Sequence, residues 1–460
     1  MSKSPNISDL IDLKKAELTS KILDYFDGDQ EGHLVKLLND PNKGRKDWQS
    51  RGIIPRTRNI LKMVVDKSGL LFNDKAPTLD VYTSGELDEA TSAVLQAHLE
   101  NLDWIEFFTN FDSVVRMLKT ACILVQYDTE SSSLTFDILT QQNSAVVMNP
   151  HNKQINTLVY RTAGNADSKI QEFRVFTKEL IQDIAVNEVG EESISMSMPN
   201  PFGCVPVVSF HDTNTPRVDF WNKIPTDLVQ INDMYNLHIT DSEYAASWSK
   251  LKTLFTNARV ASDDYGISSV PQNTMIGGPS QVIQIDTTGV DSAFVEYKGP
   301  EVNLQPIDDM VNKWVADFAA DWAVNVKFGG SGTADSGFKL IVEEMPNLEL
   351  RKKRARMFEA GFKRLFRVIS KVINHYKPGA FPEDSELFAA FAAPILPVNE
   401  RDQEEVWTRR IAAGRATRAD YFMSVFGMTK QEAQDKISEI DAENAEHPNN
   451  KQVQAYTVGV

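Results

Sequence analysis

Two helix-forming segments separated by a β-rich insertion constrain the fold of this chain more than any other feature. The first is predicted to open at Pro225-Thr226-Asp227 and to run to about Leu254. The second begins at Pro306, because proline is favourable in a first helical turn. One face of this second helix carries an apolar stripe at helical spacing, made of Ile307, Met310, Val311, Trp314, Val315, Phe318 and Trp322. Residues 259–298 are strand-like and interrupted by Gly and Pro, so we expect paired helices with a β module at their tip.

The region before these helices is predicted to contain helices followed by a sheet. Apolar spacing indicates helices at 7–25, 59–71 and 86–119, and the Asn-, Gly- and Pro-rich segment 28–58 is expected to be a loop. Beyond residue 121, short apolar runs alternate with turn residues, as in antiparallel hairpins. The predicted strands are 122–127, 134–138, 145–148, 158–161, 173–177 and 205–210. The expected fold class is therefore α+β.

A glycine-rich segment and a long basic helix follow the second helix. Residues 327–338 are expected to form a flexible loop, and a helix is predicted from Pro346 to about Tyr376. Its apolar face consists of Phe358, Phe362, Leu365, Phe366, Ile369 and Ile373. Its other face carries Arg351, Lys352, Lys353, Arg354, Arg356, Lys363, Arg364, Arg367 and Lys371. These cations suit either nucleic acid or the acidic face of a neighbouring subunit, and the acidity of the chain favours the second.

The C-terminal region is predicted to be a set of short helices. One runs from Asn399 to Gly414, and two more open at Thr417 and Thr429. The last of these has Glu432 three residues after Thr429, which is the pattern of a capping box. A DNA-binding helix-turn-helix is disfavoured because the last helix is rich in carboxylates, so we expect an interaction surface there. The final ten or so residues are polar and are expected to be disordered.

Composition limits the kinds of partner. The chain has 48 Lys and Arg against 64 Asp and Glu, a net charge of −16, which opposes tight binding to nucleic acid. Acidity that merely confers solubility is the simpler interpretation. The two cysteines, Cys122 and Cys204, lie in apolar surroundings and are expected to be buried thiols. No apolar run approaches the roughly 20 residues that a membrane-spanning helix needs.

Patterns that carry catalytic chemistry fail at critical positions. The glycines at 332 and 337 have the spacing of a phosphate-binding loop, but Phe338 stands where lysine is required. The seven histidines are scattered without the spacing of a zinc site, and no nucleophile elbow occurs. We therefore expect no catalytic residues, no metal site, no cofactor and no enzymatic activity.

The order of the parts, together with two short motifs, resembles a known family. The α+β region ends in Asn-Pro-Phe-Gly-Cys-Val-Pro-Val-Val-Ser-Phe at 200–210, and the first helix of the pair carries Asp-Leu-Val-Gln-Ile-Asn-Asp-Met-Tyr-Asn at 227–236. A β insertion, a return helix, a loop ending in Ser-Gly-Phe-Lys-Leu at 336–340, a long helix and terminal helices complete the order. This arrangement resembles the portal proteins of tailed bacteriophages over about residues 5–445.

The resemblance implies a portal-like subunit with seven parts. These are a wing of helices and mainly antiparallel sheet at 1–215, a first stem helix at 216–256, a clip at 257–300, a second stem helix at 301–326, a channel loop at 327–345, a long helix returning to the wing at 346–396, and a helical crown with a disordered tail at 397–460. The apolar stripe of the second stem helix is then expected to serve in stem packing. The channel-loop residues expected to contact DNA are Lys327, Phe328, Gly329, Gly330, Ser331, Gly332, Thr333 and Lys339.

The function that the resemblance implies is a dodecameric ring at one capsid vertex, through which double-stranded DNA passes during packaging and ejection. The implied partners are other copies of the chain, the large terminase, head-completion adaptors, and the major capsid and scaffolding proteins, with no membrane. The implied location is the virion, with assembly in the host cytoplasm. An acidic channel wall would keep contacts with DNA weak, so that DNA slides. The alternatives are a virion scaffold or adaptor that forms no ring and, less favoured, a nucleotide-dependent packaging enzyme.

Overall fold

The computed structural model describes residues 13–40, 48–50, 52–72, 76–149, 154–163, 169–213, 219–249, 253–256, 259–260, 285–286, 292, 295–298, 303–326, 337–392, 400–426 and 428–446. The chain forms two compact units. The first comprises Met1–Gly330 and Pro346–Pro394, and the second comprises Ser331–Met345 and Ile395–Val460. The described elements are helices and antiparallel sheets, so the expected α+β class is confirmed.

The first unit opens with helices whose limits differ from the predicted ones. They are α2 (Leu13–Asp27), α3 (Glu31–Leu38), α4 (Ile60–Val65), α5 (Glu89–Glu100) and α6 (Trp104–Leu118). The prediction of a loop over 28–58 was wrong at α3, because Leu34 and Leu38 lie one turn apart and are both buried. The predicted helix 86–119 is interrupted, since its first two residues form strand β2 (Glu86–Leu87) and a break at 101–103 separates α5 from α6.

Three antiparallel sheets make up the rest of the body. One has the order β15-β1-β2, the second β10-β3-β4 and the third β5-β6-β7-β8-β9. Their strands are β1 (Thr78–Thr83), β3 (Thr120–Asp128), β4 (Ser133–Leu139), β5 (Ser144–Met148), β6 (Ile155–Ala163), β7 (Ile170–Thr177), β8 (Leu180–Asn187), β9 (Glu192–Pro199), β10 (Val207–His211) and β15 (Ser385–Ala390). The six predicted strands are present, whereas β1, β2, β8, β9 and β15 were missed. In β9, serine alternates with apolar residues that stay largely exposed, so it carries no core pattern.

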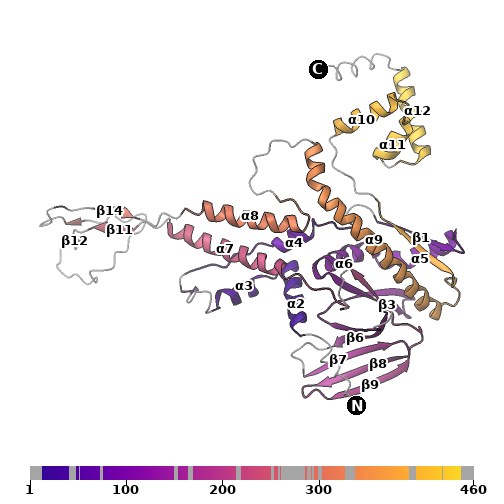
Figure 1. The fold of residues 1–460 in the computed structure, drawn as a ribbon, viewed down its shortest axis with the longest axis horizontal. Coiled ribbons are helices and arrows are strands. Elements are labelled where there is room, and N and C mark those ends of the chain that lie inside the picture. Colours follow the sequence, from indigo (N-terminus) through magenta and orange to yellow (C-terminus); the bar gives the residue numbers. More distant parts are fainter. Residues whose placement is uncertain are drawn as a thin grey trace. The chain divides into compact units, whose positions relative to one another are not determined.

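The helix–β–helix order predicted from the sequence is observed. Helix α7 (Asp227–Ser249) and helix α8 (Gln305–Asp321) lie side by side (Figure 1) and share one apolar core with α2, α4 and α6. Between them, β11 (Thr253–Thr256) pairs with β14 (Val295–Lys298), and β12 (Arg259–Val260) pairs with β13 (Ile285–Asp286). Within the segment 259–298 that was predicted to be strand-like, residues 261–284 lie outside the described residues.

The long helix α9 (Gly337–Tyr376) forms the centre of the main core. It starts nine residues before the predicted start, so Pro346 lies inside the helix and Lys339 lies on it rather than in a loop. All six residues of its predicted apolar face are buried, none more than 2% exposed. Their aromatic rings pack against α6 and β10, with Phe108 and Phe362 at a centroid distance of 4.7 Å. Gly361 is required there, because a Cβ atom at this position would lie 2.6 Å from Cδ1 of Phe210.

The second unit contains three short helices, α10 (Glu400–Ala412), α11 (Arg418–Phe426) and α12 (Lys430–Glu446). The predicted capping box is confirmed, since the backbone N–H of Thr429 donates to Glu432 Oε2 at 2.8 Å and the backbone N–H of Glu432 donates to Thr429 Oγ1 at 3.4 Å. Thr417 and Asp420 make the same pair of reciprocal contacts at the start of α11. The expected disordered tail lies outside the described residues. In the part of the chain that the structure describes, no helix has the length and apolar character to cross a membrane.

Candidate functional site

The apolar stripe predicted for stem packing divides into two sets. Val311, Val315, Phe318 and Trp322 are at most 8% exposed and pack against Leu228 and Val229 of α7 and against α2, α4 and α6. Ile307, Met310 and Trp314 are 46%, 42% and 44% exposed. Because these three follow the spacing i, i+3, i+7, they form one row on the surface of α8. The helix therefore buries one face within its own chain and leaves a second apolar face uncovered.

The channel-loop residues are only partly placed. Residues 327–333 lie outside the described residues, and Lys339 lies in the first turn of α9. The structure does describe both flanks, which are the end of α8 with the residues as far as Val326 on one side and α9 on the other. The end of α8 and Arg354 of α9 both contact a buried group of charged side chains.

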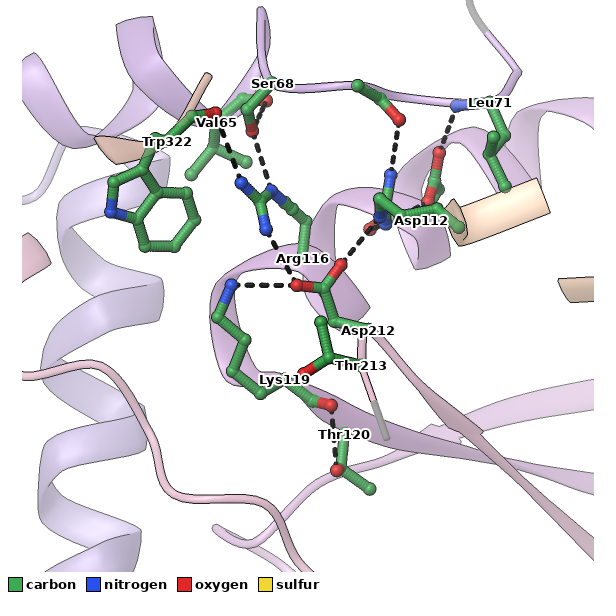
Figure 2. Close-up of polar contacts among 12 residues, drawn as sticks. Val65, Ser68, Leu71, Asp112, Arg116, Lys119, Thr120, Asp212, Thr213 and Trp322 are labelled. Carbon is green, nitrogen blue, oxygen red and sulfur yellow. Dashed lines mark hydrogen bonds and ion pairs between the residues drawn. The ribbon is translucent and has the colours of Figure 1, made fainter. Parts of the chain in front are cut away.

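We call this group the ionic cluster, and it consists of Asp112, Arg116, Lys119 and Asp212, which are labelled in Figure 2, together with Arg354. Asp212 follows β10 and accepts from Arg116 Nη1 at 2.7 Å, Lys119 Nζ at 2.8 Å and Arg354 Nε at 2.6 Å. Arg354 also donates to Asp112 Oδ1 at 2.6 Å. Four of the five residues are at most 5% exposed, and only Lys119 reaches solvent to a small extent. The cluster therefore joins α6, β10 and α9 deep inside the unit.

The ionic cluster also holds the end of α8. Arg116 donates to the carbonyl oxygen of Trp322 at 3.3 Å, and its guanidinium lies 4.4 Å from the centroid of the Trp322 ring. Lys119 Nζ lies 4.1 Å from the same ring, a favourable cation–π distance. On the α9 side, Arg354 donates to the carbonyl of Gly69 at 2.8 Å. The end of α8 and Arg354, in the part of α9 that belongs to the first unit, thus contact the same cluster.

The buried charges of the ionic cluster stabilise one another, as expected of residues that hold a fold together. Burial alone would raise the pKa of Asp212, but Arg354, Arg116 and Lys119 together hold it well below its usual range. Burial lowers the pKa of Lys119 to about 8, despite the attraction of Asp212. Three cations face two carboxylates, and the Trp322 ring partly offsets the excess positive charge. Each charge is paired, which is the condition under which a buried charge is tolerated.

A row of polar side chains on α7 fastens the N-terminal region to this helix. Asn232, Asn236 and Thr240 are spaced by four residues and are at most 1% exposed. Asn232 Oδ1 accepts from the backbone N–H of Ile60 at 2.8 Å, and Asn236 Oδ1 accepts from that of Arg58 at 2.8 Å. The Asn236 that ends the motif at 227–236 is therefore a backbone clamp, a role that sequence reasoning missed. The sequence did contain a pattern that could have predicted this role, because three small polar residues recur at helical spacing within an otherwise apolar face.

The motif at 200–210 connects the β-sheet that contains β9 to β10 and contacts the end of α9. Asn200 Nδ2 donates to the carbonyls of Thr177 and Cys204, and its Oδ1 accepts from the Phe202 N–H at 3.0 Å. The turn passes through Gly203, whose φ of +61° suits glycine. Phe202 packs edge-on against His375 near the end of α9, at a centroid distance of 5.6 Å. The motif thus holds a turn in place and joins it to α9.

Neither cysteine supplies a reactive group. Cys122 is fully buried, as predicted, and Cys204 is partly exposed. Burial raises the pKa of both thiols. Among the described residues, no three His, Cys, Asp or Glu side chains gather as metal ligands would. The polar groups described above, namely the ionic cluster, the row on α7 and the turn at Asn200, all connect helices and strands of the described chain to one another.

An α+β body bearing paired helices with a β module between them has the architecture of a portal subunit. The model of one family, phage portal protein, SPP1 Gp6-like, matches residues 58–450. Because the match spans most of the chain, the chain belongs to this family of structural proteins. The resemblance inferred from the sequence is therefore confirmed. No curated protein sequence gives a significant match.

Solved structures that resemble the chain include parts of gene transfer agent (GTA) particles. A chain in the neck of an empty GTA particle, computed with C6 symmetry, is 12% identical with a TM-score of 0.45, over 83% of this chain and 93% of that chain. One in the neck of a native GTA particle, computed with C12 symmetry, is 12% identical with a TM-score of 0.42, over 79% and 89%. One in the virion of a native GTA particle is 11% identical with a TM-score of 0.40, over 80% and 89%.

Proposed function

We propose that this chain forms a ring at one vertex of a virion, through which double-stranded DNA passes during packaging and ejection. The observation that carries the proposal is the uncovered apolar row on α8. Ile307, Met310 and Trp314 are each more than two-fifths exposed, beside a face that is fully packed within the chain. An exposed row of large apolar side chains next to acidic residues marks a protein–protein contact. Family membership supports another copy of the chain as the partner.

The geometry of a ring explains why one helix has two apolar faces. In a closed ring, each subunit contacts the next through two different surfaces. The inner face of α8 packs on α7 of its own chain, and the row Ile307, Met310 and Trp314 packs on the next copy. A dodecamer is the ring size that portal membership favours.

The other segments of the chain have separate roles in this proposal. The segment 327–345 supplies the channel surface, where Lys327 and Lys339 contact the DNA backbone transiently. The β11–β14 module docks the large terminase during packaging and head-completion adaptors afterwards. The wing and the helical crown contact the capsid and scaffolding proteins, with assembly in the host cytoplasm before the ring resides in the virion. The paired charges of the ionic cluster support a structural rather than catalytic role.

The test is the oligomeric state of the purified chain, by negative-stain electron microscopy and mass photometry. We expect rings with a central hole and a mass near an integer multiple of 51.6 kDa. The double variant Met310→Gln/Trp314→Gln should dissociate the ring, because it removes apolar contacts between copies. The matched control is Val94→Gln/Ile105→Gln, which changes residues of similar exposure, 39% and 46%, on α5 and α6. A chain that stays monomeric beside its capsid and scaffold would be an adaptor instead, and a ring that survives the first variant contradicts the α8 contact.

A further inference from the structure

The basic residues of α9 fall into two groups with different environments. Arg351 and Arg354 are buried, 8% and 0% exposed, and bond to groups inside the unit. Five exposed residues lie in one row, which we call the basic stripe: Lys352, Arg356, Lys363, Arg367 and Lys371. The predicted basic cluster is therefore partly an internal anchor and partly a surface.

The helix presents the basic stripe as a fixed row. Its members are separated by four, seven, four and four residues, so they fall within about 100° of the helix circumference and extend over roughly 28 Å. The opposite side of the helix is the buried apolar face, so α9 cannot rotate the row away from solvent. Lys353 is exposed beside the row and widens it, whereas Arg364 donates to the carbonyl oxygen of Ser209 at 2.9 Å.

Among the described residues, only one member of the basic stripe pairs with a carboxylate. Arg367 lies 3.6 Å from Glu386, a pair in which both side chains are about two-thirds exposed. The other four members form no ion pair with described residues. Like charges held in one row repel one another, and an extended anion relieves that repulsion. The chain elsewhere is acidic, so a polyanion would meet attraction here and repulsion over most other surfaces.

We propose that the basic stripe of α9 binds the phosphate backbone of double-stranded DNA without sequence preference, at a surface separate from the segment 327–336. Each strand of duplex DNA offers a phosphate about every 3.4 Å along the axis, so a row of roughly 28 Å meets several phosphates. The competing occupant is the acidic face of a second copy. The most acidic described helix, α12, fits that role poorly, because Glu432, Glu439 and Asp441 already bond to Thr429, Lys436 and Arg418.

The proposal is tested by the affinity of the assembled protein for a fluorescent duplex of about 30 base pairs, measured by anisotropy at several salt concentrations. The variant is Lys352→Gln/Lys363→Gln/Lys371→Gln, which keeps helix-forming side chains of similar length. The control is Lys36→Gln/Lys178→Gln/Lys223→Gln, which removes three exposed lysines from α3 and two loops and gives the same net charge.

We expect the stripe variant to bind about tenfold more weakly, with a salt dependence reduced by about three phosphate contacts. The control should stay within about twofold of the wild type, and two unrelated duplex sequences should bind alike. An equal loss in both variants, or no binding by the wild type, overturns the proposal. So does a stripe variant that binds DNA normally but no longer assembles, because the row would then contact another copy.

The choice of DNA rests on the proposed function, but the two can fail separately. A chain that forms no ring yet loses DNA affinity only in the stripe variant would contradict the portal proposal and retain this one. A ring whose DNA binding is abolished by deleting residues 329–333, and is unchanged in the stripe variant, would retain the portal proposal and contradict this one.

Discussion

Asp212 shows how a single residue supports the arrangement of several elements. Its carboxylate is the shared acceptor of Arg116, Lys119 and Arg354, so Asp212→Asn leaves three buried cations with one carboxylate among them. Breaking a buried ion pair by removing one partner costs about 3–5 kcal/mol. We expect Asp212→Asn to lower the free energy of unfolding by that amount in urea denaturation. The same change at Asp183, whose pair with Arg174 is partly exposed, should cost less than about 1 kcal/mol. Equal effects of the two substitutions would show that the ionic cluster is not a structural centre.

His211, next to Asp212, gives the fold a dependence on pH. Burial, with the nearby Arg364, lowers its pKa from 6.5 to about 4. At pH values between about 4 and 6.5 the unfolded chain binds more protons than the folded chain. The stability that comes from keeping His211 neutral is therefore fully present above pH 6.5 and is lost as the pH falls. From about pH 7 to about pH 5 the loss is about 2 kcal/mol. Urea denaturation should show that His211→Asn loses less stability over this range than the wild type, while the exposed His375→Asn behaves like the wild type. Parallel pH profiles for all three proteins would refute this role of His211.

At the scale of elements, the contact between α9 and β10 determines the effect of a glycine substitution. Gly361→Ala would ordinarily stabilise a helix by about 1 kcal/mol. Here the added methyl group meets the Phe210 ring, and overpacking of a core costs about 1–3 kcal/mol. We expect a net loss of stability in thermal or urea unfolding. Gly32→Ala in α3, where the added Cβ would meet no side chain or neighbouring element within 4 Å, should be neutral or stabilising. A stabilising Gly361→Ala would mean that Phe210 is free to move aside.

The elements that could be predicted from the sequence are those with repeated local patterns. The apolar face of α9 repeats over several turns, and the capping box at Thr429 lies within four residues, so both were predicted correctly. The ionic cluster was not predicted, because Asp212 lies 142 residues from Arg354 in the sequence. The burial of Arg354 itself could have been predicted, because Arg354 lies one turn of α9 before the buried Phe358 and therefore on the same face of the helix. The exposure of Ile307, Met310 and Trp314 on α8 could not be predicted either. The spacing of apolar residues does not show which side of a wide apolar stripe packs within the same chain.

For the whole molecule, the net charge sets a condition on assembly. Every copy carries −16, so bringing copies into a ring concentrates negative charge. The contact proposed on α8 is apolar and is therefore little weakened by salt, whereas repulsion between exposed charges is screened. Binding of DNA to the basic stripe has the opposite dependence, because salt competes with the cations for phosphate.

Salt should therefore move assembly and DNA binding in opposite directions. Between about 50 mM and about 300 mM salt, where the screening length falls to well below 10 Å, we expect the ring fraction in mass photometry to rise. Over the same range the affinity for duplex DNA should fall steeply. If the ring fraction instead falls with salt, ion pairs rather than apolar side chains hold the copies together. The basic stripe would then be the first candidate for that contact, and the stripe variant would identify it by losing the salt dependence.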